Sequence, residues 1–151
     1  MLANTTTPIT ILMTLMASLL FAPLPAADSP LASTIPDAFI GSYIVTKMQD
    51  IAQKEYELQR PSTITVAPER LVIALRFPDG QSFTEALLVS KVSSGGQTIV
   101  IVSENEATGA GALHGILPNA NEQGDTLFLI MAPGDDGNPA PRYVLTITHT
   151  Q

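Results

Sequence analysis

After Pro61 the sequence alternates between short apolar runs and short breaks rich in Gly, Asn, Asp and Pro. Seven runs can be delimited, at residues 62–66, 71–77, 83–92, 98–102, 112–117, 126–131 and 142–148. Runs of this length, bounded by turn residues, are typical of β-strands. Connections this short join antiparallel neighbours, because parallel strands need long crossovers. The sequence therefore predicts a mainly β fold, an antiparallel meander of about seven strands closed as a small barrel or sandwich.

Residues 36–58 fit two patterns. Ile40, Ile44, Met48 and Ile51 recur at helical spacing. In contrast, residues 39–46 are dense in β-branched and aromatic side chains, as a first strand would be. A short strand to about residue 47 followed by a helix to residue 58 satisfies both patterns, so we expect one N-terminal helix. Within the run 83–92, a change in the apolar phase predicts a β-bulge between residues 83 and 88.

The N-terminal 27 residues have a different character. No Lys, Arg, Asp or Glu precedes Asp28, and residues 9–22 form an apolar run of 14 residues followed by Pro-Leu-Pro-Ala-Ala. This order predicts a secretory signal peptide over residues 1–27. The run is shorter than the roughly 20 residues that cross a bilayer. Because the segment begins without Lys or Arg, an uncleaved anchor and a folded helix remain alternatives.

The domain organisation follows from that interpretation. We expect residues 1–27 to be a signal peptide, residues 28–35 a tether and residues 36–151 a single β-barrel-like domain. A chain with such a leader is periplasmic or secreted. With no cysteine, it would fold in an oxidising compartment without disulfides.

Charge and composition exclude several classes of partner. The formal net charge is −7, and the seven basic residues are widely spaced. Phosphate backbones and anionic lipid surfaces attract clusters of Lys and Arg, so we expect no nucleic-acid binding. We also expect no stable membrane insertion once the leader is removed. The absence of cysteine rules out thiol catalysis and Cys-based metal sites.

The sequence offers little for catalysis. Only His114 and His149 could supply an imidazole base, and neither lies in a recognisable nucleophile or metalloprotease motif. We therefore predict a protein that is not an enzyme, with no catalytic residue, no metal site and no cofactor. His114 follows a Gly-Ala-Gly stretch at the entrance to a strand, where a ligand could approach the backbone. The alternative is a flexible loop that leads into a β-bulge.

Two tyrosines are further candidates for binding. Aromatic residues are sparse and Trp is absent, and most of them fit a core role. If the first and last strands pair, we expect Tyr43 and Tyr143 to meet at one end of the barrel, with their hydroxyls facing a cavity or a partner. The candidate ligand-binding residues are thus Tyr43, Tyr143 and His114.

Some short motifs resemble those of lipocalin-like domains. Residues 39–43, Phe-Ile-Gly-Ser-Tyr, stand where these domains carry an opening Gly-x-Trp motif, with Tyr43 in place of the Trp. Residues 64–66, 71–73, 124–129 and 142–145 resemble strands of small exported bacterial β-barrel domains. The resemblance implies a barrel over residues 39–148. It departs from lipocalins in lacking their Thr-Asp-Tyr turn.

Two functions remain open at this point. The first is an exported, non-enzymatic binding domain that holds a small apolar ligand in a lipocalin-like barrel. The second is a protein-binding accessory or inhibitor module of the cell envelope, which would use an edge strand or its acidic loops.

Overall fold

The computed structural model describes residues 32–150, which contain nine strands and one short 3-10 helix. The elements in chain order are η1 (Asp37–Phe39), β1 (Gly41–Asp50), β2 (Glu55–Tyr56), β3 (Thr63–Ala67), β4 (Arg70–Arg76), β5 (Ser82–Gly95), β6 (Thr98–Asn105), β7 (Gly111–Leu117), β8 (Thr126–Pro133) and β9 (Pro139–His149). Every strand pairs antiparallel with its neighbours. The prediction of a mainly β, antiparallel fold is confirmed.

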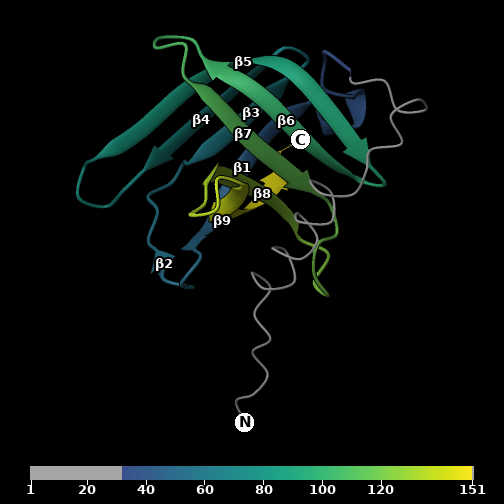
Figure 1. Cartoon of the computed structure of the whole chain (residues 1–151). Coiled ribbons are helices and arrows are strands. Elements are labelled where there is room, and N and C mark those ends of the chain that lie inside the picture. Colours follow the sequence, from purple (N-terminus) through teal and green to yellow (C-terminus); the bar gives the residue numbers. More distant parts are fainter. Residues whose placement is uncertain (1–31, 151) are drawn as a thin grey trace.

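Eight of the strands close into a barrel (Figure 1). The sheet runs from β1 through β3 and then in sequence order to β9, and β9 pairs back onto β1. The seam extends from Tyr43 opposite His149 to Asp50 opposite Tyr143. Strand β2 lies outside this circle and pairs only with the end of β1. Closure leaves no open edge among the eight barrel strands, which removes the usual route to edge-to-edge aggregation.

The seven predicted runs correspond to β3–β9, but the barrel has eight strands and the predicted N-terminal helix is wrong. Residues 41–50 form β1, paired with β3 on one side and β9 on the other. A bulge between Val45 and Lys47 interrupts the alternation of this strand, so its buried positions are Tyr43, Val45 and Met48. Of the residues at helical spacing only Met48 is buried, while Ile51 is 54% exposed beyond the end of the strand. Within residues 32–150 no α-helix forms.

The bulge predicted in β5 also lies elsewhere. The register against β4 is regular from Ser82 to Leu88, and the irregularity falls between Val89 and Lys91. Phe83, Glu85 and Leu87 therefore share one face of the strand. The charged Glu85 at a position facing into the barrel produced the apparent change of phase in the sequence.

The barrel is filled at its centre. One cluster of buried apolar side chains draws on every one of the eight strands, including Ile64, Ile73, Leu87, Phe128 and Leu145, each with no exposed surface. At about 25 cal/mol per Å² of buried apolar surface, such a core supplies most of the stabilisation of a cysteine-free domain. The interior is thus a packed core with space only toward one end.

One end of the barrel, here called the closed end, is sealed by the residues before β1. Ala32 forms a β-bridge with Val92, and the Ile35 amide donates to the Pro68 carbonyl over 2.8 Å. The Ile35 side chain is 2% exposed and belongs to the core, with Phe39 packed against it from η1. Contacts with the barrel thus begin within the predicted tether. The predicted signal peptide and residues 28–31 lie outside the described residues.

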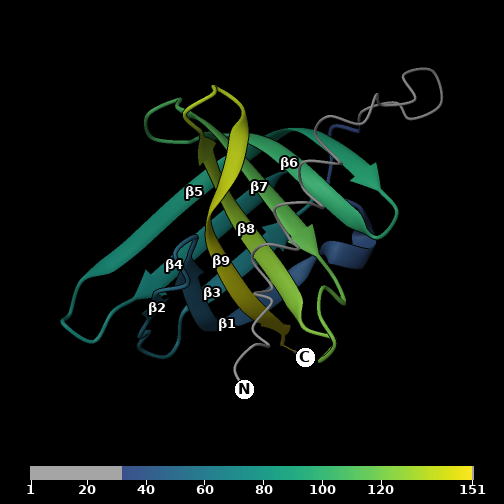
Figure 2. The ribbon, with the colours of Figure 1, turned by 60° about the horizontal axis from the view of Figure 1, so that its bottom comes forward.

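The opposite end, here called the open end, carries the β4–β5 turn, the β6–β7 and β8–β9 loops and β2. Figure 2 shows β2 and the β4–β5 turn on one side of the barrel and η1 on the other. The strand registers require this arrangement, since Arg76 pairs with Ser82 and Asp50 pairs with Tyr143. The two ends of the barrel therefore differ in how they are covered.

A second apolar cluster lies on the outer face of β6–β9. Its members alternate with the core residues of the same strands and so point outward: Val100, Leu117, Leu127, Leu129, Met131 and Val144. Leu113 and Ala120 pack against them. These strands are therefore apolar on both faces, which explains their continuous hydrophobic runs in the sequence.

Candidate functional site

The open end holds an apolar pocket inside the rim of the barrel, here called the mouth. Its volume is about 240 Å³, and it is lined by Met48, Leu75, Phe77, Phe83, Ile130 and Tyr143. These side chains come from β1, β4, β5, β8 and β9 and from the residue after β4. Phe83 is 43% exposed, although its strand position directs it toward the interior. An exposed aromatic ring at a pocket is a surface that an apolar ligand can cover.

A second hollow adjoins the mouth. It shares Met48, Phe77 and Tyr143 with the mouth and extends outward over about 470 Å³ toward the β4–β5 turn. Its remaining lining includes the carboxylates Glu57 and Asp79. A molecule that filled the mouth would therefore project into a region with polar groups and negative charge.

Strand β2 places Tyr56 against Tyr143 at the rim. The two rings meet edge to face, with centroids 6.1 Å apart and planes 76° apart. Such a pair contributes about 0.5–1.5 kcal/mol beyond the area that it buries. The Lys54 ammonium lies 5.1 Å from the centre of the Tyr56 ring, on its face. Tyr56 is thus held from several sides.

Asp50 fixes the loop that carries Tyr56. One of its carboxylate oxygens accepts from the amides of Ala52 and Lys54, each over 2.9 Å, and the other accepts from the Tyr56 hydroxyl over 3.0 Å. Partial desolvation raises the pKa of Asp50, but these hydrogen bonds outweigh it, and the pKa lies below its usual value. The hydrogen bond to Asp50 also raises the pKa of Tyr56. Asp50 is therefore ionised at neutral pH, the form that accepts all three hydrogen bonds.

The wall formed by β5, β6 and β7 carries polar side chains on the inner face. Near the open end, the Asn105 amide donates to Glu85 over 3.1 Å. Deeper in, Ser103 has no exposed surface and His114 is 1% exposed. The Ser103 hydroxyl oxygen and His114 Nδ1 are buried with no hydrogen-bond partner. Most buried polar groups in proteins are paired, so each of these two requires an explanation.

His114 is neutral at physiological pH. Its ring lies 5.3 Å from that of Phe128, with the planes tilted by 31°, inside the apolar core. Desolvation by burial lowers the pKa of His114 from 6.5 to about 4. A neutral imidazole carries one donor nitrogen and one acceptor nitrogen, so it can bind an uncharged polar group.

The structure separates the two candidate tyrosines. The first and last strands do pair, but Tyr43 lies opposite His149, whereas Tyr143 lies opposite Asp50. The expectation that they meet at one end is wrong, because the antiparallel register places them at opposite ends. The Tyr43 hydroxyl donates to the Phe39 carbonyl over 2.9 Å, and burial raises its pKa. Tyr43 therefore helps to seal the closed end, while Tyr143 lines the mouth.

His114, the third candidate, lies within β7 and faces the interior rather than a flexible loop. Sequence reasoning missed Met48, Tyr56 and Phe83 as residues of the site. The sequence did contain one indication for Phe83. It closely follows the Pro-Asp-Gly turn, and a residue just after a turn lies near an end of the barrel. Tyr56 carried none, because β2 is defined only by its pairing with β1.

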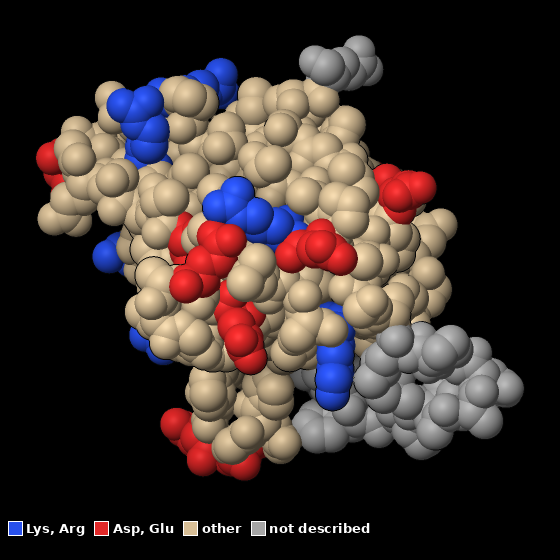
Figure 3. Space-filling view, turned by 90° about the horizontal axis from the view of Figure 1, so that it is seen from above, with Lys and Arg blue, Asp and Glu red and all other residues tan. Residues whose placement is uncertain are grey.

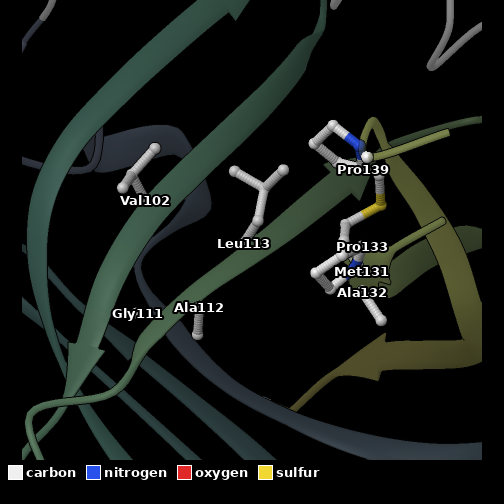
Figure 4. A pocket seen from close by; sticks show the side chains of 9 residues that line it. Val102, Gly111, Ala112, Leu113, Met131, Ala132, Pro133 and Pro139 are labelled. Carbon is white, nitrogen blue, oxygen red and sulfur yellow. The ribbon is translucent and has the colours of Figure 1, made fainter. Parts of the chain in front are cut away.

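An apolar hollow also lies on the outer side of the barrel. Its volume is about 260 Å³, and Figure 4 shows its lining from β6, β7, β8 and the start of β9. Val102, Leu113, Met131 and Pro139 supply most of its side chains. No titratable group lines this hollow. It offers apolar contact without a polar group that would orient a ligand, so the mouth is the better candidate site.

Charge is dispersed over the face seen in Figure 3. Lys and Arg lie among Asp and Glu there and form no continuous basic patch. Arg70 and Glu106 form a two-pronged ion pair, with nitrogen–oxygen distances of 2.9 and 3.1 Å. In residues 32–150, no group of three or more His, Asp or Glu side chains could hold a metal ion. No helix in that part of the chain is long and apolar enough to cross a membrane.

Comparison with known proteins gives no relative. No family model, curated protein or solved structure matches the chain. The geometry of the open end is therefore the basis for any statement about function.

Proposed function

We propose that this chain is an exported, non-enzymatic binding domain of lipocalin-like type, which holds a small apolar ligand at the open end of its barrel. The observation that carries the proposal is the exposure of Phe83 beside an apolar pocket inside the rim. Exposing such a ring to water is unfavourable, and a ligand that covers it regains part of that free energy.

The size of the mouth limits the ligand. Pockets for drug-sized molecules measure about 300–1,000 Å³, and the mouth alone holds about 240 Å³. The packed centre below it excludes a long chain fully enclosed in the barrel. The proposal is therefore a single ring or a short branched chain in the mouth, with any larger part in the adjoining hollow near Glu57 and Asp79. Those carboxylates favour a neutral or cationic outer part over an anionic one.

Displacement of a hydrophobic fluorescent dye tests this proposal. We expect the dye to bind the wild-type protein and to be displaced by small aromatic compounds, with a rise in the melting temperature. Phe83→Ala should weaken dye binding about tenfold or more, since a buried aromatic side chain contributes about 1.5–3 kcal/mol. Leu88→Ala is the matched control, because Leu88 is 50% exposed on the opposite face of β5. Equal loss of binding in both variants, or no binding in the wild type, contradicts the proposal.

A protein-binding accessory or inhibitor module is the second candidate. The acidic net charge of −7 supports it, since acidic loops could meet a basic partner. An edge-strand mode has little support, because closure leaves only the two-residue β2 outside the circle of barrel strands. Capture from envelope extract at low salt, lost at high salt and unaffected by Phe83→Ala, distinguishes this candidate from the first.

A further inference from the structure

Two buried polar atoms stand without partners in the inner wall of the barrel. They are the Ser103 hydroxyl oxygen and His114 Nδ1. A polar group left unpaired in a core destabilises the fold by the loss of its hydration, whereas an apolar residue of similar shape has no such cost. These two unpaired groups are therefore candidates to bind a polar group that is not part of the described residues.

The two residues are neighbours on one face of the wall. Ser103 pairs with Ala112, and His114 pairs with Ile101, on the adjacent strands β6 and β7. Ser103 and His114 are thus diagonal neighbours, which in an antiparallel sheet lie about 7–8 Å apart at the backbone with their side chains closer. One oxygen atom placed between them can bond to both, because each bond spans about 2.8 Å.

The pair lies next to the mouth. Ile130 lines the mouth and is the direct cross-strand partner of His114. On the mouth side of His114, the next inward position of β7 is Ala112, a small side chain opposite the equally small Ser103. Ile130 therefore lies between the mouth and His114, and its side chain would have to move for a ligand in the mouth to reach the polar pair.

The chemistry of the pair selects the ligand group. A neutral imidazole and a hydroxyl both donate and accept, so they suit an uncharged hydroxyl or carbonyl. A carboxylate would be buried beside them without a cation and at high cost. The inner face of this wall also carries the carboxylate of Glu85, which accepts a hydrogen bond from Asn105 and would repel an anion.

We propose that Ser103 and His114 form the deep end of the mouth, where they bind the hydroxyl or carbonyl group of an uncharged, otherwise apolar ligand. The apolar part of that ligand occupies the mouth, in contact with Phe83, Ile130 and Tyr143. This inference rests on the proposed function, because it takes the mouth to be a ligand site. It adds the class of ligand and the orientation, with the polar tip innermost.

The test compares 4-propylphenol with propylbenzene, which differ by one hydroxyl. Binding is measured by calorimetry on protein purified after expression of the full chain. The ring nitrogens of the two histidines are followed in parallel by NMR, and His149 at the closed end is an internal reference. We expect 4-propylphenol to shift the His114 signals in a saturable manner and to leave those of His149 unchanged.

Variants of the pair measure the hydrogen bonds. Ser103→Ala and His114→Phe should each reduce the preference for 4-propylphenol over propylbenzene about fivefold, because a net hydrogen bond is worth about 0.5–1.5 kcal/mol. Phe83→Ala should lower the affinity for 4-propylphenol and for propylbenzene by the same factor. Ser103→Ala removes only an unpaired hydroxyl, so its melting temperature should not fall below that of the wild type. The test therefore includes at least one variant that remains as stable as the wild type.

The possible failures can be told apart. Both compounds could bind, with lower affinity in Phe83→Ala, while 4-propylphenol leaves the His114 signals unchanged and the variants Ser103→Ala and His114→Phe keep the wild-type preference. In that case the deep polar site is wrong, and the mouth is still supported as a ligand site. The deep polar site is also wrong if a bound water holds the pair in the presence of ligand. If neither compound binds, the proposed function fails together with this inference.

Discussion

The closed and open ends of the barrel are formed by the same strands but are covered differently. At the closed end, Ile35 enters the core and the Tyr43 hydroxyl is bonded to a backbone carbonyl. At the open end, Phe83 stays 43% exposed, and the mouth lies beneath it. Local chain seals the closed end, whereas the open end leaves apolar surface exposed, which the proposed ligand site requires. The comparison predicts unequal effects of similar substitutions.

The largest effect should come from a pair of truncations, one at each end. Ile35→Ala should lower the free energy of unfolding by about 3 kcal/mol, because it leaves a cavity where a 2% exposed side chain was packed. Phe83→Ala should cost less than about 1 kcal/mol, since 43% of this side chain is already exposed and its removal leaves no enclosed cavity. Urea unfolding of both variants measures the difference. Equal losses would mean that the two ends do not differ in the way described.

The second prediction concerns the wall between the two ends. In the unfolded chain, the imidazole of His114 takes up a proton near pH 6.5, whereas in the folded protein it does so only near a pKa of about 4. The neutral, buried imidazole of His114 therefore makes its full contribution to the free energy of unfolding above pH 6.5. As the pH falls toward 4, this free energy decreases by about 2–3 kcal/mol. His114→Phe should remove this part of the pH dependence, as measured by urea unfolding between pH 7 and 4.

Carboxylates elsewhere in the chain are the same in both proteins, so the difference between wild type and His114→Phe isolates the imidazole. Parallel stability curves over this pH range would show that folding does not lower the pKa of His114. That result would mean that His114 is in contact with water. It would contradict the description of His114 as a buried polar group in the wall next to the open end.

The smallest effect is expected at the seam beside the closed end. Gly41 has φ +147°, and a Cβ at this position would collide with the His149 ring, which packs edge to face on Tyr43 at 4.9 Å between centroids. Gly41→Ala should therefore cost about 1–2 kcal/mol more than Gly80→Ala. Gly80 also has a positive φ, but a Cβ there would meet nothing within 4 Å. Thermal unfolding measures the loss of stability in the two variants. Equal losses would mean that backbone strain, and not the collision with His149, accounts for the effect.

Particular residues show how much of the fold and of the site could be predicted from the sequence. Alternation and turn chemistry located β3–β9, because these strands carry their own apolar runs between Gly, Asn, Asp and Pro. Strand β1 was obscured because its bulge breaks the alternation of a strand and because Ile40, Ile44, Met48 and Ile51 recur at helical spacing, although only Met48 of these four is buried. In the site, the sequence pointed to Tyr143 and His114 but not to Tyr56, because only its pairing with the end of β1 brings it to the rim.

The sequence alone determined the strand-rich character, the acidic and cysteine-free composition and the prediction of a leader, because these depend on local patterns and residue counts. Only the tertiary structure decided that eight strands close, that Tyr43 and Tyr143 lie at opposite ends and that Ser103 and His114 face the same interior. The physical reason is register: a shift of one residue moves every side chain of a strand to the other face, and a bulge makes such a shift without a distinctive sequence signal.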